Sequence, residues 1–184
     1  MRIGIVGAGP AGCHLADRLG SLDHQILLFD PRAPYEKPCG GGLGPLIGRH
    51  LPDVMALPFP RHHPSRLVLR ASDGGQMEQT FAQPPWAIVS REEFGRAVLE
   101  RALARERVCL TRQRVVDLVR LAGVWQVTTA SGEVFSVDYL VGADGVRSIV
   151  RRRLVGPIPR QHLALASGYF VQGAPDAIVF QTFS

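Results

Sequence analysis

The feature that most constrains the fold is a glycine-rich turn between an apolar run, residues 3–6, and a helical stretch. Its glycines have the spacing of a dinucleotide-binding fingerprint, in which each glycine has its own steric role. Gly7 permits a tight turn, Gly9 lets the backbone approach a pyrophosphate, and Gly12 lets the helix pack closely against the strand. The amides at the start of that helix favour phosphate charge. The predicted binding residues of this turn are Gly7, Gly9, Pro10, Ala11 and Gly12.

A second apolar run, residues 26–29, ends in an acidic residue, Asp30. Its carboxylate can accept hydrogen bonds from the ribose hydroxyls of adenosine, and it would repel a 2′-phosphate. The pattern therefore favours an adenine dinucleotide without that phosphate, with Pro31 and Arg32 beside it. A glycine-rich turn in another kind of α/β protein is the alternative. The order of strand, helix, strand and acid argues against that alternative.

A second glycine-containing segment lies far downstream, at residues 142–148, after an apolar run that we expect to return to the main sheet. We expect this segment to meet the first turn in space, and the pair of sites suggests a bound flavin dinucleotide, FAD. The candidate cofactor-binding residues in the second segment are Gly142, Asp144, Gly145 and Ser148.

Composition indicates a globular protein rather than a membrane-spanning or disulfide-bonded one. The 184 residues can form one core, or a domain with an added lobe, and no apolar stretch approaches the roughly 20 residues of a membrane span. The three cysteines lie far apart without metal-ligand spacing, so we expect free thiols and no metal site. With a strand directly at the N-terminus, we expect a soluble, cytoplasmic protein, and peripheral membrane association stays open.

The chain is basic, with a formal net charge of +5, and its only lysine is Lys37. Arginine is densest at residues 151–153, which could contact a pyrophosphate, an anionic lipid surface or nucleic acid, or could form a solvated helix face. Because no nucleic-acid-binding module surrounds this cluster, we expect no nucleic-acid partner. The sequence does not determine the oligomeric state.

Hydrophobic alternation and turn residues divide the chain into short elements. Ser90 and Glu93 have the spacing of a helix capping box. We expect a loop over residues 31–44, a helix within 43–51, a hairpin of 66–71 and 77–81, a helix over 91–105, a parallel strand at 108–111, a meander of 115–121, 124–129 and 134–137, a strand at 139–142, and a last strand over 177–184.

These motifs resemble the two-domain FAD-dependent family that contains aromatic hydroxylases and geranylgeranyl reductases. The resemblance rests on the first turn with Asp30, on the run GADG-x-x-S-x-x-R that ends at Arg151, and on Arg91 in an Arg-x-x-Phe helix start. It implies an α/β, FAD/NAD(P)-binding Rossmann-like three-layer fold with an antiparallel β-meander and part of a β-rich substrate lobe. It also implies that Asp144 lies near the flavin pyrophosphate, that Arg91 lies near the cofactor, and that NAD(P)H can serve as electron donor.

By this resemblance, residues 1–60 and 88–156 form the FAD-binding domain, and residues 61–87 and 157–184 form part of the substrate-binding lobe. The chain departs from the family at Asp30, where glutamate is commoner. It also lacks the family's third cofactor motif, a Gly-Asp that would lie downstream of Ser184. We therefore expect the chain to be part of a longer protein, truncated at its C-terminus.

The segment around Cys39 separates the two branches of the family. It looks like the K-x-CGGG segment of the geranylgeranyl reductases, and its glycines could let backbone approach the isoalloxazine ring. Positive charge at Lys37 would lower the pKa of the Cys39 thiol. An incidental cysteine in a flexible loop is the alternative. The candidate residues here are Cys39 as a catalytic residue, with Lys37, Gly40, Gly41, Gly42 and Leu43 as cofactor-binding residues.

The resulting first hypothesis is an FAD-dependent oxidoreductase that reduces carbon–carbon double bonds of an apolar isoprenoid by hydride transfer from reduced flavin. The second is a flavin-dependent monooxygenase that hydroxylates an aromatic or lipid substrate; it shares every cofactor residue, and only the CGGG segment argues against it. The third is a dinucleotide-binding fragment that has no activity of its own.

Overall fold

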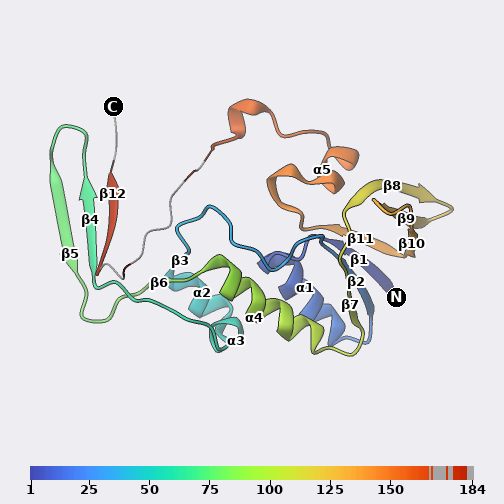
Figure 1. Cartoon of the computed structure of the whole chain (residues 1–184), viewed down its shortest axis with the longest axis horizontal. Helices are drawn as coiled ribbons and strands as arrows, with labels where there is room; N and C mark the ends of the chain where they lie inside the picture. Colours follow the sequence, from blue (N-terminus) through green and yellow to red (C-terminus); the bar gives the residue numbers. More distant parts are fainter. Residues whose placement is uncertain (166, 168–172, 174–175, 182–184) are drawn as a thin grey trace. The chain divides into compact units, whose positions relative to one another are not determined.

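The computed structural model describes residues 1–165, 167, 173 and 176–181 of the chain (Figure 1). The chain divides into two compact units. The first unit comprises Met1–Tyr35 and Phe94–Leu165, and the second comprises Glu36–Glu93 and Ala166–Ser184. The assignment of the predicted cofactor-binding and substrate-binding domains to residues stays a prediction.

The first unit is built on a four-stranded parallel sheet in the order β11-β1-β2-β7. The predicted Rossmann-like arrangement is confirmed, because β1 is central and its neighbours come from distant parts of the chain. The strands are β1 (Arg2–Val6), β2 (Gln25–Phe29), β7 (Val108–Thr111) and β11 (Tyr139–Gly142). The helices of this unit include α1 (Pro10–Gly20) and α4 (Arg91–Leu103). The first three residues of α4 belong to the second unit.

Strand alternation gives the sheet two apolar faces. Val6, Leu27 and Phe29 pack against an antiparallel meander, and Phe29 meets Phe135 edge to face with ring centroids 5.3 Å apart. Leu28 is fully buried on the opposite face, which α1 covers. The predicted meander is confirmed as β8 (Val115–Leu121), β9 (Val124–Thr129) and β10 (Val134–Val137), so the unit has the expected three layers of helix, parallel sheet and meander (Figure 1).

A buried carboxylate joins the two long helices. Asp17 of α1 is almost completely buried, and its two oxygens lie 2.8 Å from Nε of Arg101 and 2.7 Å from Nε of Arg105. Both arginine side chains retain contact with solvent, whereas the carboxylate does not. The arginines therefore compensate a charge that has no access to water.

After β11 the chain forms short helices, η1 (Gly145–Arg147), α5 (Ile149–Leu154) and η2 (Arg160–His162). Within the residues that the structure describes, no helix has the length and apolar character needed to span a membrane.

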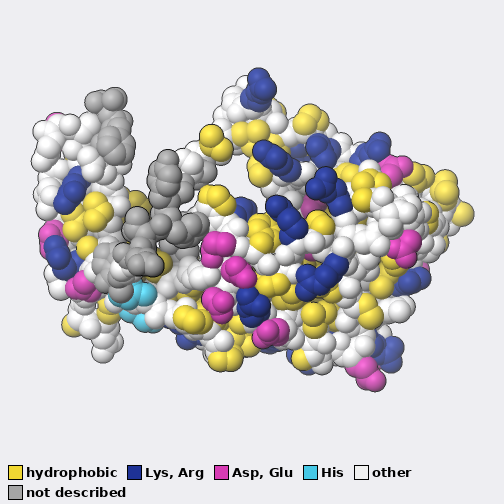
Figure 2. Space-filling view, in the orientation of Figure 1, with side chains coloured by type: hydrophobic (Ala, Val, Ile, Leu, Met, Phe, Trp, Pro, Cys, Tyr) yellow, Lys and Arg dark blue, Asp and Glu magenta, His cyan; other side chains and the backbone are white. Residues whose placement is uncertain are grey.

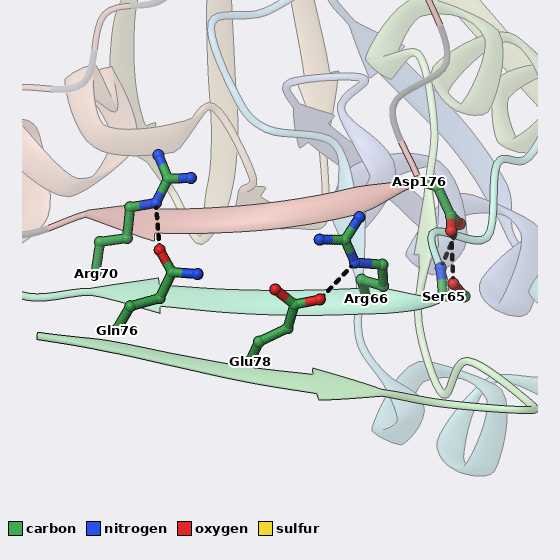
Figure 3. Close-up of polar contacts among 6 residues, drawn as sticks. All are labelled: Ser65, Arg66, Arg70, Gln76, Glu78 and Asp176. Atoms are coloured by element: carbon green, nitrogen blue, oxygen red, sulfur yellow. Dashed lines mark hydrogen bonds and ion pairs between the residues drawn. The ribbon is translucent and has the colours of Figure 1, made fainter.

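The second unit contains two small sheets. The predicted hairpin is confirmed as β4 (Arg66–Arg70) and β5 (Gln76–Thr80), and β12 (Ala177–Gln181) pairs with β4 in parallel. The last three residues of the expected strand over 177–184 lie outside the described residues. Cross-strand contacts of Arg66 with Glu78 and of Arg70 with Gln76 line one face of this sheet, and Ser65 donates two hydrogen bonds to Asp176 where β12 begins (Figure 3).

Two details of the second unit correct the sequence-based expectations. The loop expected over residues 31–44 ends in a short strand, β3 (Gly42–Leu43), which pairs with β6 (Ala87–Ile88). The expected helix within 43–51 is α2 (Pro45–His50), and a further turn of helix, α3 (Pro52–Met55), follows it. Two-residue strands and one-turn helices are too short to produce a periodic sequence pattern.

We expect Arg101→Met/Arg105→Met to lower the free energy of unfolding by about 3 kcal/mol or more, because the double substitution leaves the Asp17 carboxylate buried without a counter-charge. Urea denaturation followed by tryptophan fluorescence measures this change. The exposed Arg18→Met on α1 is the control and should shift stability by less than about 0.5 kcal/mol. Equal effects of the control and the double variant would contradict a role for the buried charge.

Candidate functional site

The two glycine-containing motifs meet at the carboxyl ends of β1 and β11, as expected. The amide of Ala143 donates to the carbonyl of Val6 over 2.7 Å, and the amide of Gly7 donates to the carbonyl of Phe29 over 2.7 Å. A Cβ atom at Gly7 would lie 2.5 Å from the carbonyl oxygen of Ala143, and the φ angle of Gly7 is +101°. Glycine is therefore required at position 7 by both the turn and the contact with the second motif.

The other two glycines of the first turn have different surroundings. A Cβ atom at Gly12 would lie 1.9 Å from the carbonyl oxygen of Gly7, so this position cannot hold a larger residue without moving the helix away from the turn. A Cβ atom at Gly9 would meet no atom of the described residues within 4 Å. The protein itself therefore gives no reason for glycine at position 9, and a ligand that approaches the backbone there would give one.

The amino end of α1 is the uncapped end of a long helix. Gly9 is its N-cap without a side-chain hydrogen bond, Pro10 occupies the first helical position, and the first turn contains no acidic residue. In contrast, Glu36 and Ser90 cap the amino end of α4. The amides of the first turn of α1 are thus available to an anion, as a dinucleotide pyrophosphate requires.

Asp30 follows β2 at the same edge of the sheet, but its carboxylate already has backbone partners. One oxygen accepts from the amide of Ala8 at 3.0 Å, and the other accepts from the amides of Arg32 at 2.9 Å and Ala33 at 3.0 Å. A carboxylate has about four lone-pair positions, so capacity remains for one ribose hydroxyl. The acid therefore holds the glycine-rich turn in place as well as facing the predicted adenosine site.

Asp144 and Ser148 organise the second motif. One oxygen of Asp144 accepts from the amide of Ile149 at 2.6 Å, and the Ser148 hydroxyl accepts from the amide of Arg151 at 2.9 Å, which caps α5. The other Asp144 oxygen, Oδ1, is buried and has no hydrogen-bond partner among the described residues. Such an oxygen suits a hydroxyl donor on a ligand, whereas an anionic phosphate would be repelled.

The remaining predicted residues lie in the second unit, around Cys39 and Arg91. Nη1 of Arg91 lies 3.6 Å from the sulfur of Cys39, and Nε of Arg91 is buried without a hydrogen-bond partner in the described part of the chain. The predicted site residues therefore form two groups. The first unit holds Gly7, Gly9, Pro10, Ala11, Gly12, Asp30, Pro31, Arg32, Gly142, Asp144, Gly145 and Ser148, and the second unit holds Lys37, Cys39, Gly40, Gly41, Gly42, Leu43 and Arg91.

The three glycines after Cys39 are not equivalent. Gly41 has a φ angle of +66°, and a Cβ atom there would lie 2.1 Å from the carbonyl oxygen of Val89. A Cβ atom at Gly40 would meet nothing within 4 Å, and one at Gly42 would make only ordinary contact with Ile88. Close approach of the loop to its own protein therefore explains Gly41, and only Gly40 and Gly42 are left for the predicted approach to a flavin ring.

The surroundings of Cys39 favour its thiolate. The pKa of the Cys39 thiol lies below its usual value, and a hydrogen bond from the amide of Gly41 is the largest cause. A hydrogen bond and the positive charge of Arg91 also lower this pKa, and the charge of Lys37 lowers it less. Partial burial of the thiol acts in the opposite direction. The predicted direction is confirmed, although Arg91 and Gly41 contribute more than Lys37. Burial, with the Asp30 carboxylate, raises the pKa of the Cys13 thiol to about 12, so that cysteine is an inert helix residue.

The sequence analysis missed Glu36, which holds the start of α4. Its carboxylate accepts from the Ser90 hydroxyl at 2.6 Å and from the amides of Arg91 at 3.0 Å and Glu92 at 3.3 Å. Burial raises the pKa of Glu36, but these hydrogen bonds and one from the Lys37 amide outweigh it and lower the pKa overall. No local pattern connects Glu36 to a helix that begins more than 50 residues later. Arg112, also missed, donates to the carbonyl of Ala33 at 2.7 Å.

Comparison with known proteins finds FAD-dependent monooxygenases and a reductase among the proteins that are similar to this chain. No protein-family model matches the chain. An alignment of 203 positions joins the whole chain to 48% of 3-amino-4-hydroxybenzoate 2-monooxygenase of Streptomyces cremeus, and the two are 29% identical over it. An alignment of 161 positions joins 82% of the chain to 39% of menaquinone reductase of Mycobacterium tuberculosis, and the two are 30% identical over it. The chain spans less than half the length of each of these relatives.

Similar solved structures identify the fold of the chain. The structure of PqsL, a probable FAD-dependent monooxygenase from Pseudomonas aeruginosa, superposes with a TM-score of 0.62 over 84% of this chain and 45% of that chain, at 23% identity. The chain has the FAD-binding monooxygenase fold. The structure of p-nitrophenol 4-monooxygenase PnpA from Pseudomonas putida shares this monooxygenase fold, with a TM-score of 0.64 over 81% of this chain and 42% of that chain, at 16% identity.

We expect Cys39 to be alkylated by iodoacetamide at a lower pH than an ordinary thiol, because its pKa is lowered and the thiolate is the reacting form. The rate measured between about pH 6 and 10, in a Cys109→Ser background, gives this pKa. Arg91→Gln should move the pKa upward, toward the usual value.

Lys37→Gln is the matched control for that substitution, because it removes a charge that contributes less than Arg91 does. A larger upward shift in Lys37→Gln than in Arg91→Gln would contradict the assigned order of the two contributions.

Proposed function

We propose that this chain forms the FAD-binding part of a flavin-dependent monooxygenase that hydroxylates an aromatic substrate. The observation that carries the proposal is the junction between the Gly7 turn and the Ala143–Asp144 segment. There the amino end of α1 has no side-chain cap, and Oδ1 of Asp144 is buried without a hydrogen-bond partner among the described residues. The names of the relatives support the reaction class, because 3-amino-4-hydroxybenzoate 2-monooxygenase and 3-hydroxybenzoate 6-hydroxylase both act on aromatic acids.

The chain's residues would divide the binding of FAD among themselves. The first-turn amides of α1 would bind the pyrophosphate, Asp30 would accept a hydrogen bond from the adenosine ribose, and Oδ1 of Asp144 would accept one from a hydroxyl of the ribityl chain. When bound, FAD supplies the redox chemistry, with NAD(P)H proposed as electron donor. The protein's own contribution in this proposal is to bind and orient the cofactor.

A second candidate function is the reduction of isoprenoid carbon–carbon double bonds. Two observations favour it: a menaquinone reductase is among the relatives, and the Cys39 thiol has a lowered pKa beside Arg91. In this reading Cys39 would lie at the reacting face, where a thiol with a lowered pKa could deliver a proton. The relatives and neighbours are mainly monooxygenases, so this candidate has less support than the first.

Gly9→Ala tests the cofactor site directly. We expect it to weaken FAD binding about tenfold or more, because a methyl group would block the close approach of the pyrophosphate to the backbone amides. The thermal midpoint of the apoprotein should stay unchanged, since a Cβ atom at Gly9 would contact none of the described residues. FAD titration followed by flavin fluorescence measures the affinity.

Gly48→Ala is the matched control, because Gly48 lies outside the predicted cofactor-binding residues and a Cβ atom there would also meet no described atom within 4 Å. Unchanged affinity in Gly9→Ala would contradict the proposed pyrophosphate site. Failure of the unsubstituted chain to bind FAD would contradict the first proposal, because these residues would then not hold the cofactor by themselves.

Turnover with NAD(P)H and either 3-hydroxybenzoate or a prenylated substrate separates the two enzymatic candidates. A monooxygenase should consume oxygen in step with the appearance of a hydroxylated product, and Cys39→Ser should leave that rate within about twofold of the unsubstituted protein. A reductase should instead saturate a prenyl double bond in the absence of oxygen, and Cys39→Ser should then lower the rate. Anaerobic saturation without any oxygen-dependent hydroxylation would overturn the first candidate.

A further inference from the structure

Residues 145–165, which follow β11 and contain η1, α5 and η2, form a segment with an unusual charge composition. We call it the arginine-rich segment. It contains no aspartate or glutamate, and its positive charge is as large as the formal net charge of the entire chain, +5. Its five arginines are Arg147, Arg151, Arg152, Arg153 and Arg160.

The protein's own structure uses only some of these arginines. Arg151 donates to the carbonyl of Gly156 over 2.5 Å, and Arg153 forms an ion pair with Asp117 at 2.6 Å. Arg147, Arg152 and Arg160 are exposed, and none of them pairs with an acidic group in the part of the chain that the structure describes. Three positive charges are therefore available to an external anion.

The same segment also exposes several large apolar side chains. Val150 is buried in the core, but Val155 is 78% exposed and Leu165 is 97% exposed. Figure 2 shows hydrophobic side chains beside arginine side chains over the region where Figure 1 draws α5 and the residues after it. The exposed large apolar residues of the segment are Val146, Leu154, Val155, Leu163 and Leu165.

This combination of side chains discriminates among anionic partners. A dinucleotide phosphate or a nucleic acid would use the charges and would leave the exposed aliphatic residues in water. Single-stranded nucleic acid is also bound through aromatic stacking, and the segment contains no Phe, Tyr or Trp. A bilayer surface uses both features, because cations bind anionic headgroups while aliphatic side chains enter the boundary with the acyl chains.

We propose that the arginine-rich segment is a docking surface for an anionic lipid bilayer. Arg147, Arg152 and Arg160 bind the headgroups, and Val155 and Leu165 insert among them. The strength of binding at a bilayer surface rises with the apolar area buried and with the electrostatic attraction to anionic lipids, and this segment offers both contributions. The proposal does not depend on the reaction that the protein catalyses.

Cosedimentation of the 184-residue chain with sucrose-loaded phosphatidylcholine vesicles, with or without about 30 mol% phosphatidylserine, tests the proposal. We expect partitioning at least about tenfold stronger on the phosphatidylserine vesicles, and weaker binding in about 0.5 M NaCl because salt screens the arginines.

Two double variants with matched controls locate the surface. Arg152→Gln/Arg160→Gln should lower partitioning about 25-fold, or about fivefold for each arginine, whereas Arg18→Gln/Arg49→Gln removes the same charge elsewhere and should change it less than about twofold. Val155→Ser/Leu165→Ser should also weaken binding, and Leu22→Ser/Leu46→Ser, at two exposed leucines outside the segment, should not.

Absence of vesicle binding would overturn the proposal. Equal losses of vesicle binding in the segment variants and in their controls would also overturn it, because net charge alone would then explain the binding. Loss of NADPH binding in Arg152→Gln/Arg160→Gln with vesicle partitioning unchanged would overturn it too, because the cluster would then be a nucleotide site. Each result is read by sedimentation or titration, so none depends on whether the proposed monooxygenase activity is found.

Discussion

The pairing of β1 with β11 is the interaction on which the candidate cofactor site depends. It joins residues more than 130 positions apart, in a register that sets Val6 opposite Gly142, and it places the Gly7 turn directly against the backbone of Ala143. On its other side β1 pairs with β2, which places Asp30 at the same edge. Three strand ends thus converge on one short segment of backbone, and the lack of a side chain at Gly7 allows them to do so.

Charged side chains that support the fold have partners within it. The buried Asp17 carboxylate meets Arg101 and Arg105, and the half-buried Glu36 carboxylate accepts hydrogen bonds from amides at the start of α4. The amino end of α1 has no such carboxylate, so its positive end remains open for a ligand. The cations of the arginine-rich segment that lack acidic partners lie on the surface, where a partner of opposite charge can reach them. Charged groups that have partners within the fold therefore serve its structure, and those without such partners are available for binding.

Elements with a clear period were predictable from the sequence. The parallel strands, the meander, the β4–β5 hairpin and the two long helices follow from alternation, helical spacing and turn residues. The two-residue strands β3 and β6 and the single turn α3 were not predictable, because so few residues carry no periodic signal. The position of Glu36 was equally hidden. A carboxylate that caps a helix from a distant loop follows only from where the loop folds back.

The residue types alone determined the Gly-rich turn, the acid after the second strand and the meeting of the two glycine motifs, because these depend on local geometry and on the order of strands. Tertiary structure decided why each glycine is there. A Cβ atom at Gly7 or Gly41 would meet backbone from a distant segment, whereas one at Gly9 or Gly40 would meet nothing within 4 Å in the part of the chain that the structure describes. It also decided that Arg91 rather than Lys37 is the main cation acting on Cys39. Such distinctions depend on distances between atoms remote in sequence, and these distances exist only once the chain has folded.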